Sequence, residues 1–226
     1  LLYVDDLLIA GTSQGVIQEL KTQLNKRFEM SDLGEVSHLL GMHITRDRQR
    51  KMLFINQKAY ISKALERFGL SDCNPTIIPM DPNTKLKKLN MDEVCTSKPY
   101  RSLIGTLLYA ASHTRPDISY GVSYLSRFME NPSEEHWNYA KRILRYLKGT
   151  ATYGILFDGR KPFTIEGYTD ADWGSDVNNK RRSTSGWIFT LCGGAITWKS
   201  KQQTSVALSS CEAEFVAMSE AVKELL

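Results

Sequence analysis

Apolar and polar residues alternate in short blocks at the start of the chain. Residues 1–4 and 7–10 are two apolar runs, and Asp5 and Asp6 stand between them. Apolar runs of this length predict short buried strands, and the polar pair between them predicts a tight turn. We therefore expect a hairpin that holds two carboxylates at its tip, against a dry core.

Longer stretches carry the spacing of amphipathic helices. Ser13 is a suitable N-cap for the first helix, and Gly69 is a suitable C-cap for the second. The apolar stripes predict helices over residues 13–28 and 57–68, three helices between residues 100 and 149, and a final helix over 208–226. Residues 71–98 lack this period and contain prolines and the lysine-rich patch Lys85, Lys87 and Lys88, so we expect an irregular connection there.

Short runs typical of strands come before the final helix. Strands are predicted over residues 39–44, 53–55, 152–157, 163–169, 186–191 and 195–199. Several strands followed by a helix, without regular alternation, indicate a mostly antiparallel sheet covered by a helix. The predicted fold class is α/β, of the α+β type.

The composition is that of an ordinary globular protein. The chain has 226 residues and a net charge of +4, which permits a nucleic-acid partner and does not require one. Four cysteines far apart in the sequence, without a Cys-x-x-Cys pair, argue against a structural zinc site and suit a reducing compartment. No apolar run is long enough to span a bilayer and no signal peptide is visible, so we expect a protein that is not secreted. Both ends lie inside predicted elements, which suggests a fragment of a longer chain.

The carboxylates Asp5 and Asp6 are the first candidates for chemistry. Neighbouring carboxylates repel each other unless a cation neutralises them. Oxygen ligands held on rigid strands suit Mg²⁺, and Mg²⁺ suits phosphoryl chemistry. The alternative is that both are ordinary turn residues, because Asp favours turns through its own hydrogen bonds to the backbone.

A second acidic group lies near the end of the chain. Asp170 ends a predicted strand, and Glu214 shares a helix face with Cys211, Met218, Ala221 and Leu225. Glu212 fits a capping box that begins at Ser209. An acid on an apolar face is costly unless it meets a partner or a metal, so Asp170 and Glu214 could converge on Mg²⁺. The alternative is that Glu214 lies at the edge of the stripe and reaches water.

Motifs that include Tyr168-Thr169-Asp170-Ala171-Asp172-Trp173 and Ser209-Ser210-Cys211-Glu212-Ala213-Glu214 follow one another in one collinear order. Together they resemble copia-type retrotransposon Pol polyproteins. The hairpin Tyr3-Val4-Asp5-Asp6 is similar to the Tyr-x-Asp-Asp hairpin of reverse transcriptases. Further segments of the same polymerase, of its connection region and of its ribonuclease H domain resemble residues 31–34, 40–42, 57–61, 100–105, 114–118, 142–150, 167–173, 180–186, 198–203 and 207–215. The resemblance implies a palm and thumb-like remnant at 1–70, a linker and helical connection at 71–149, and a truncated ribonuclease H-like mixed sheet with a covering helix at 150–226.

The resemblance also implies roles for individual residues. Asp5 matches the principal metal ligand of the polymerase pair and Asp6 its neighbour, while Tyr3 matches the residue that approaches the primer end. Asp170 matches the first catalytic Asp of ribonuclease H, and Glu214 its catalytic Glu. The implied cofactor is Mg²⁺, with Mn²⁺ as a substitute. Each family site has further acids that match no residue here, so we expect the chain alone to be catalytically incomplete.

The implied partners are an RNA template, a DNA primer and an RNA–DNA hybrid, inside the cell in a cytoplasmic particle or the nucleus. Two groups of cations are candidates for phosphate contact. The first is on one predicted helix and comprises Lys141, Arg142, Arg145 and Lys148; the second is a strand connection with Lys180, Arg181 and Arg182. The alternatives are a solvated helix face and a solubilising turn. The competing function is a nucleic-acid-binding relic without catalysis, or an interaction protein unrelated to polymerases.

Overall fold

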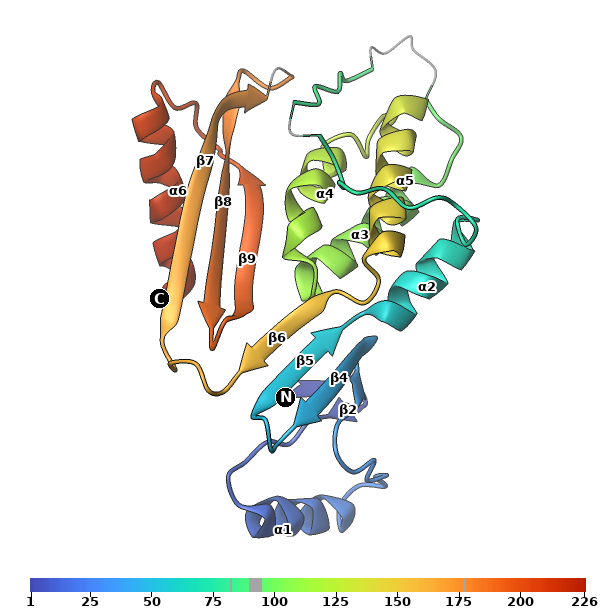
Figure 1. Cartoon of the computed structure of the whole chain (residues 1–226), viewed down its shortest axis with the longest axis vertical. Helices are drawn as coiled ribbons and strands as arrows, with labels where there is room; N and C mark the ends of the chain where they lie inside the picture. The colour runs from blue at the N-terminus through green and yellow to red at the C-terminus, as the bar shows by residue number, and fades with distance from the viewer. Residues whose placement is uncertain (82, 90–94, 177) are drawn as a thin grey trace. The chain divides into compact units, whose positions relative to one another are not determined.

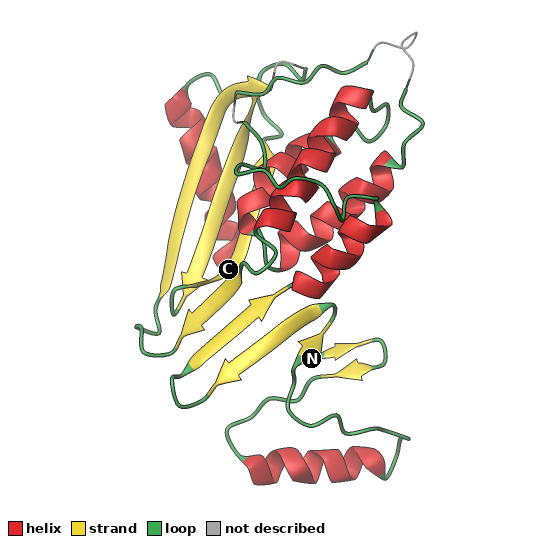
Figure 2. Ribbon diagram, turned by 45° about the vertical axis from the view of Figure 1, so that its right-hand side comes forward, coloured by secondary structure: helices red, strands yellow, loops and turns green. Residues whose placement is uncertain are grey.

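Helices and strands are mixed along the whole chain, which confirms the predicted α/β class (Figure 2). The computed structural model describes residues 1–81, 83–89, 95–176 and 178–226. They divide into two compact units, Leu1–Leu39 and Leu40–Leu226. The predicted domain boundaries after residues 70 and 149 stay predictions.

The first unit opens with the predicted hairpin. Strands β1 (Leu2–Tyr3) and β2 (Asp6–Leu7) are antiparallel. The predicted dry core is wrong, because the side chains of this hairpin are exposed: Leu2 is 72% and Val4 79% accessible. Within the described residues these two short strands pair only with each other, so they offer no second layer on which their apolar side chains could pack.

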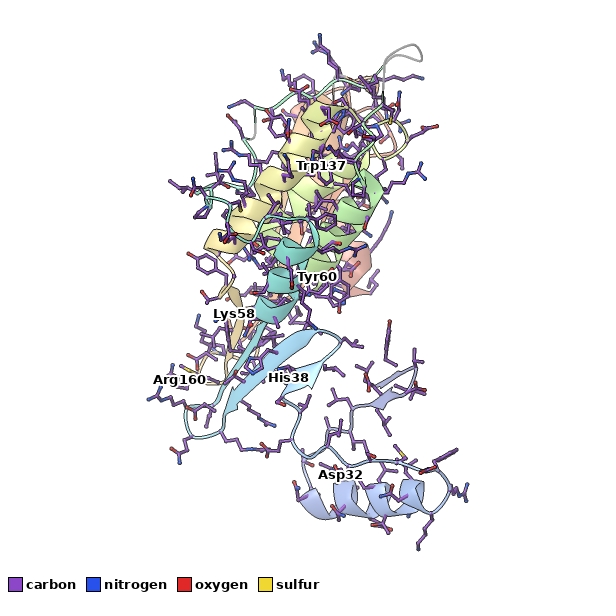
Figure 3. The ribbon with its side chains drawn as sticks, turned by 90° about the vertical axis from the view of Figure 1, so that its right-hand side faces the viewer. Asp32, His38, Lys58, Tyr60, Trp137 and Arg160 are labelled. Carbon is purple, nitrogen blue, oxygen red and sulfur yellow. The ribbon has the colours of Figure 1, made fainter. Side chains whose placement is uncertain are left out.

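Helix α1 (Gln14–Asn25) follows, and the Ser13 hydroxyl accepts a hydrogen bond from the backbone N–H of Val16, as predicted for an N-cap. The helix ends before Phe28, and none of its residues is buried, so its predicted inward stripe is wrong. A unit of this size is too small to bury an apolar stripe of its own. Lys21 instead pairs with Asp32 across the following loop, at 2.8 Å (Figure 3). The unit ends with β3 (His38–Leu39).

The second unit begins with an antiparallel sheet. Strands β4 (Met42–Asp47) and β5 (Met52–Asn56) form a hairpin, and β6 (Gly154–Asp158) pairs with β5. Ile55 lies opposite Ile155, so this sheet joins segments that are far apart in the sequence (Figure 1).

Helices between β5 and β6 build the main apolar core. They are α2 (Lys58–Arg67), α3 (Tyr100–His113), the short 3₁₀ helix η1 (Pro116–Ile118), α4 (Ser119–Ser126) and α5 (Glu134–Gly149). Their inward side chains, such as Leu103, Leu107 and Leu144, are completely buried, whereas Leu108 of α3 is exposed. Tyr60 and Trp137, both labelled in Figure 3, belong to this helical part: Tyr60 packs against the core and Trp137 is buried in it. Among the described residues of 71–98 there is no helix or strand, which confirms the irregular connection.

The last part of the unit is a three-stranded antiparallel sheet with a helix, as predicted. Strands β7 (Ile165–Asp176), β8 (Arg182–Leu191) and β9 (Gly194–Gln202) follow in order, and then α6 (Ser210–Leu225) (Figure 1). Trp187 and Phe189 of β8 pack against Ala221 of α6. On the opposite face, the indole of Trp198 donates a hydrogen bond to the carbonyl of Ala111 in α3, at 2.7 Å. The sheet therefore lies between α6 and the helical part.

Arg115 connects the helices to the strand that follows them. Its side chain is 1% exposed and donates two hydrogen bonds to the Asp117 carboxylate and two to Thr150, one of them to the backbone carbonyl at 3.0 Å. The guanidinium also lies over the rings of Tyr146 and Tyr153, at 5.4 and 5.8 Å. Since a buried charge needs a partner and acceptors for its N–H groups, Asp117 and Thr150 are what allow Arg115 to be buried.

We predict that Arg115→Met lowers the free energy of unfolding by about 3–5 kcal/mol, because it leaves Asp117 and Thr150 without their buried donor. Urea denaturation of the full chain measures this. Arg160→Met is the matched control, since Arg160 forms the same two-pronged pair with Asp158 but is exposed (Figure 3). It is expected to change stability much less. Equal losses in the two variants would contradict the assigned role of Arg115.

His136 predicts a pH dependence of stability. It is buried in the first turn of α5, stacks on Phe128 at 4.1 Å and accepts a hydrogen bond from the backbone N–H of Ser133. Burial lowers the pKa of His136 from its ordinary 6.5, and the Lys87 carbonyl opposes this shift. The folded state therefore takes up a proton less readily than the unfolded chain, and stability falls as the pH drops from 6.5 towards the lower folded value. His136→Gln keeps a capping box and should flatten this fall in denaturation curves recorded at a series of pH values. An unchanged pH profile would show that His136 is not its source.

Candidate functional site

Asp5 and Asp6 differ in their local structure. The turn consists of Val4 and Asp5, and Asp6 is the first residue of β2, so the prediction that both acids form the turn is wrong. Val4 adopts a positive φ of 50°, which completes the turn one residue earlier than the acidic pair suggested. Both carboxylates are exposed, and Asp6 lies directly opposite Tyr3 in the ladder. The hairpin thus presents two acids and a tyrosine to solvent.

Asp170 lies inside β7, because the strand continues to Asp176 and does not end at Asp170 as predicted. Pairing with β8 runs on through Asp172 and Thr184, which extends the strand. Asp170 is opposite Gly186, and neighbouring pairs alternate between the two faces of the sheet. Since Trp187 points towards α6, Asp170 projects from the opposite face, where it is exposed.

Glu214 lies on α6 beside the face that packs on the sheet. The buried residues of this helix are Ala213, Ala217 and Ala221, and Glu214 is half-buried next to them. The predicted apolar face is therefore wrong: Met218 is 52% exposed. Small alanines let the helix come close to the large side chains of β8, so the core face is the one without bulky residues.

The predicted capping box at the start of α6 is formed in part. The Ser209 hydroxyl accepts from the backbone N–H of Glu212 at 3.1 Å, as expected. The Glu212 carboxylate returns to the N–H of Leu208 at 2.7 Å, one residue before the expected partner. Glu212 thus has a structural role and Glu214 does not share it.

The described residues form no complete set of metal ligands. Within residues 1–81, 83–89, 95–176 and 178–226, no three His, Cys, Asp or Glu side chains gather where they could hold a metal ion. Each candidate pair has the hard oxygen donors that Mg²⁺ prefers, but two carboxylates are fewer than a full ligand set. All four cysteines are free.

Two of the four cations predicted on α5 to contact phosphate bond instead to backbone carbonyls of the fold. Lys148 donates to the carbonyls of Ser71 and Cys73, at 2.5 and 2.7 Å, and Arg145 donates to the carbonyl of Asn74 at 2.7 Å. These bonds fasten the segment after α2 along α5. The Nε of Arg142 is buried and has no hydrogen-bond partner among the described residues. Lys141 is half-exposed.

The cations of the β7–β8 connection are more exposed to solvent than those of α5. Lys180 and Arg181 are exposed and have positive φ values of 52° and 53°, whereas Arg182 is half-buried at the start of β8. This connection leaves β7 at Asp176, an acid that sequence reasoning did not single out. Asp176 is 4% exposed and pairs with Arg127 at 3.1 Å. Its only sequence signal is a charged residue at the end of a strand, which is too common to be informative.

A family model matches the first part of the chain. Residues 1–82 match the family model described as "Reverse transcriptase (RNA-dependent DNA polymerase)". No solved structure matches the chain significantly.

No helix in the described part of the chain is long and apolar enough to cross a membrane.

Proteins that match this chain over nearly its entire length define the family. The chain is 45% identical to the retrovirus-related Pol polyprotein from transposon TNT 1-94 of Nicotiana tabacum, over 100% of its own length and 17% of that protein. It is 38% identical to the corresponding polyprotein from transposon RE1 of Arabidopsis thaliana, again over 100% of its length and 15% of the relative. A Saccharomyces cerevisiae protein named for transposon Ty5-1 is 34% identical over 99% of this chain and 72% of its own length.

The chain belongs to the family of copia-type retrotransposon Pol polyproteins, which confirms the resemblance drawn from its motifs. It spans about one sixth of the length of the polyproteins that it matches. The matched reverse transcriptase segment includes the hairpin with Asp5 and Asp6.

The contacts of α5 generate a prediction about stability. Lys148→Met removes two charge-assisted hydrogen bonds and should lower the free energy of unfolding by about 1–2 kcal/mol. Lys141→Met, on the same helix but without these bonds, should change it by less than about 0.5 kcal/mol. Urea denaturation of both variants tests this. If the two variants are equally stable, the contacts of Lys148 do not hold the segment after α2.

Proposed function

We propose that this chain is a nucleic-acid-binding part of a reverse transcriptase and ribonuclease H machinery. In the complete polyprotein this machinery would copy RNA into DNA and hydrolyse the RNA strand of RNA–DNA hybrids. The observation that carries the proposal is the reverse transcriptase match over residues 1–82, which includes the exposed carboxylates of the hairpin. The proposed partners are the RNA template, the DNA primer and their hybrid, inside the cell.

At the hairpin, Asp5 and Asp6 would supply part of the site for nucleotide addition. Mg²⁺ fits two exposed carboxylates on a turn and its adjoining strand, and Mn²⁺ would substitute. When bound, two such ions activate the attacking oxygen and stabilise the leaving oxygen. Tyr3 lies opposite Asp6, which suits a ring that positions the primer end next to the carboxylates.

In the last sheet, Asp170 and Glu214 would supply part of the ribonuclease H site. Asp170 projects from one face of β7, and Glu214 belongs to the helix that covers the other face. Because β7 is the edge strand of this sheet, a shared ion would be held at the free edge of β7. Lys180, Arg181 and Arg182 on the β7–β8 connection would contact the hybrid backbone through charge and A-form shape.

A second candidate function is binding of nucleic acid without catalysis. It is favoured by the finding that the described residues hold no group of three metal-ligating side chains. Under both functions the cations of the β7–β8 connection bind a polyanion, and both functions predict an affinity for nucleic acid that falls steeply as salt increases.

We predict that the full chain binds an RNA–DNA hybrid in a salt-dependent manner and neither extends a primer nor cleaves the hybrid on its own. Fluorescence anisotropy at several salt concentrations measures binding. Primer extension with dNTPs and hybrid cleavage, each with Mg²⁺ or Mn²⁺, measure activity, and manganese titration followed by electron paramagnetic resonance measures metal binding.

The variants Asp5→Asn and Asp170→Asn separate the two candidates. Each should weaken Mn²⁺ binding if the pairs are parts of metal sites, while unchanged Mn²⁺ binding in both would favour the non-catalytic function. Primer extension that Asp5→Asn abolishes, or cleavage that Asp170→Asn abolishes, would show that the chain is catalytically sufficient. Failure to bind hybrid at low salt would overturn the nucleic-acid function altogether.

A further inference from the structure

The lysine-rich patch is anchored to the helical part of the chain. Leu86, between Lys85 and Lys87, is completely buried, and its backbone N–H donates to the Tyr124 hydroxyl at 2.9 Å. The lysines on either side of it are exposed, as is Lys88. A buried leucine with a satisfied backbone thus fixes a segment whose charged neighbours point to solvent.

Asn178 joins this segment to the β7–β8 connection. Its side-chain amide donates to the carbonyl of Leu86 at 2.6 Å, and its amide oxygen accepts from the backbone N–H of Lys88 at 3.2 Å. One side chain therefore pairs with the segment in both directions, although the two regions are some ninety residues apart in sequence. In Figure 1 this segment is the green loop above the helices, and it passes beside the upper ends of β7 and β8.

Asp176 holds the connection in place from the other side. Its carboxylate accepts from the backbone N–H of Asn178 at 2.9 Å, from Arg127 at 3.1 Å and from the side-chain amide of Gln202. Asn179 adds a bond to Gln202 at 3.1 Å. Because Asp176 is buried and paired with Arg127, its negative charge is already compensated and does not offset the exposed cations.

We propose that these two segments form one basic surface that binds the phosphate backbone of a nucleic acid. Its five cations are Lys85, Lys87, Lys88, Lys180 and Arg181. Lysine and arginine side chains bind phosphates without reading the base sequence. The surface is held in advance by Leu86, Asn178 and Asp176, so less ordering is needed on binding. The inference rests on the proposed function and adds the lysine patch, which that function left unassigned.

The test uses the full chain and a fluorescently labelled RNA–DNA hybrid, with anisotropy recorded over a range of salt concentrations. Lys87→Gln/Lys88→Gln and Lys180→Gln/Arg181→Gln should each reduce the slope of log affinity against log salt by about two. The matched control is Lys58→Gln/Lys63→Gln, which removes the same charge from exposed positions of α2 and should reduce the slope little.

Asn178→Ala tests whether the two segments act together. It changes no charge, and loss of the bonds between the segments should weaken hybrid binding about fivefold. Thermal unfolding of every variant shows whether the fold is retained, and Asn178→Ser repeats the test with a smaller change if Asn178→Ala is unstable.

Two outcomes separate this inference from the proposed function. If the wild-type chain binds hybrid but both cation pairs behave like the control, the basic surface is wrong and the proposed function stands. If the wild-type chain does not bind hybrid, the proposed function fails first. If both cation pairs weaken binding but Asn178 variants do not, the segments bind independently and the single surface is wrong.

Discussion

The second unit depends on the buried guanidinium of Arg115. It follows α3 directly and contacts Thr150, which follows α5, so a single side chain fixes the start and the end of the α4–α5 segment. Burial of a charge is tolerated where it meets an opposite charge and acceptors for its N–H groups, and Asp117 and Thr150 accept four hydrogen bonds from this guanidinium. After Thr150 the chain continues into β6, which pairs with β5 and is followed by β7. The sheet with the candidate nuclease acids is thus placed by an interaction in the helical part.

A similar pair, of the half-buried Arg127 and the buried Asp176, links the sheet back to the helices at its other end. Arg127 follows α4, and its contacts with Asp176 and Thr184 reach β7 and β8. Both links are made by an arginine, whose planar group can donate to several acceptors at once, whereas four of the five cations of the proposed basic surface are lysines. Identity alone does not decide the role, because an arginine and a lysine occur together in each of two further settings. Arg145 and Lys148 are used by backbone carbonyls of the connection, while Lys180 and Arg181 remain available for phosphates.

Local patterns predicted the elements well, and long-range packing decided what they could not. The capping residue Ser13, the irregular connection and the final sheet with its helix follow from signals within a few residues. Burial depends on partners that lie elsewhere in the chain. The stripes of α1 and the hairpin are apolar but exposed, and α6 buries alanines and leaves Met218 in solvent. A hydrophobic period indicates a face and does not show what covers it.

The acids of the candidate site show the same contrast between what local sequence predicts and what long-range pairing decides. The motifs identified Asp5, Asp6, Asp170 and Glu214, but the position of each acid on its element came from strand pairing. An end at Asp170 would place its carboxylate in a loop, free to turn towards α6. Pairing with Gly186 instead commits Asp170 to the face opposite α6. Since the rigid ladder cannot rotate the side chain to the other face, Asp170 and Glu214 can share an ion only around the edge of β7. Under the proposed function, any additional ligands for such an ion would therefore have to approach along this edge, which makes the edge the feature that decides whether the pair can become a catalytic site.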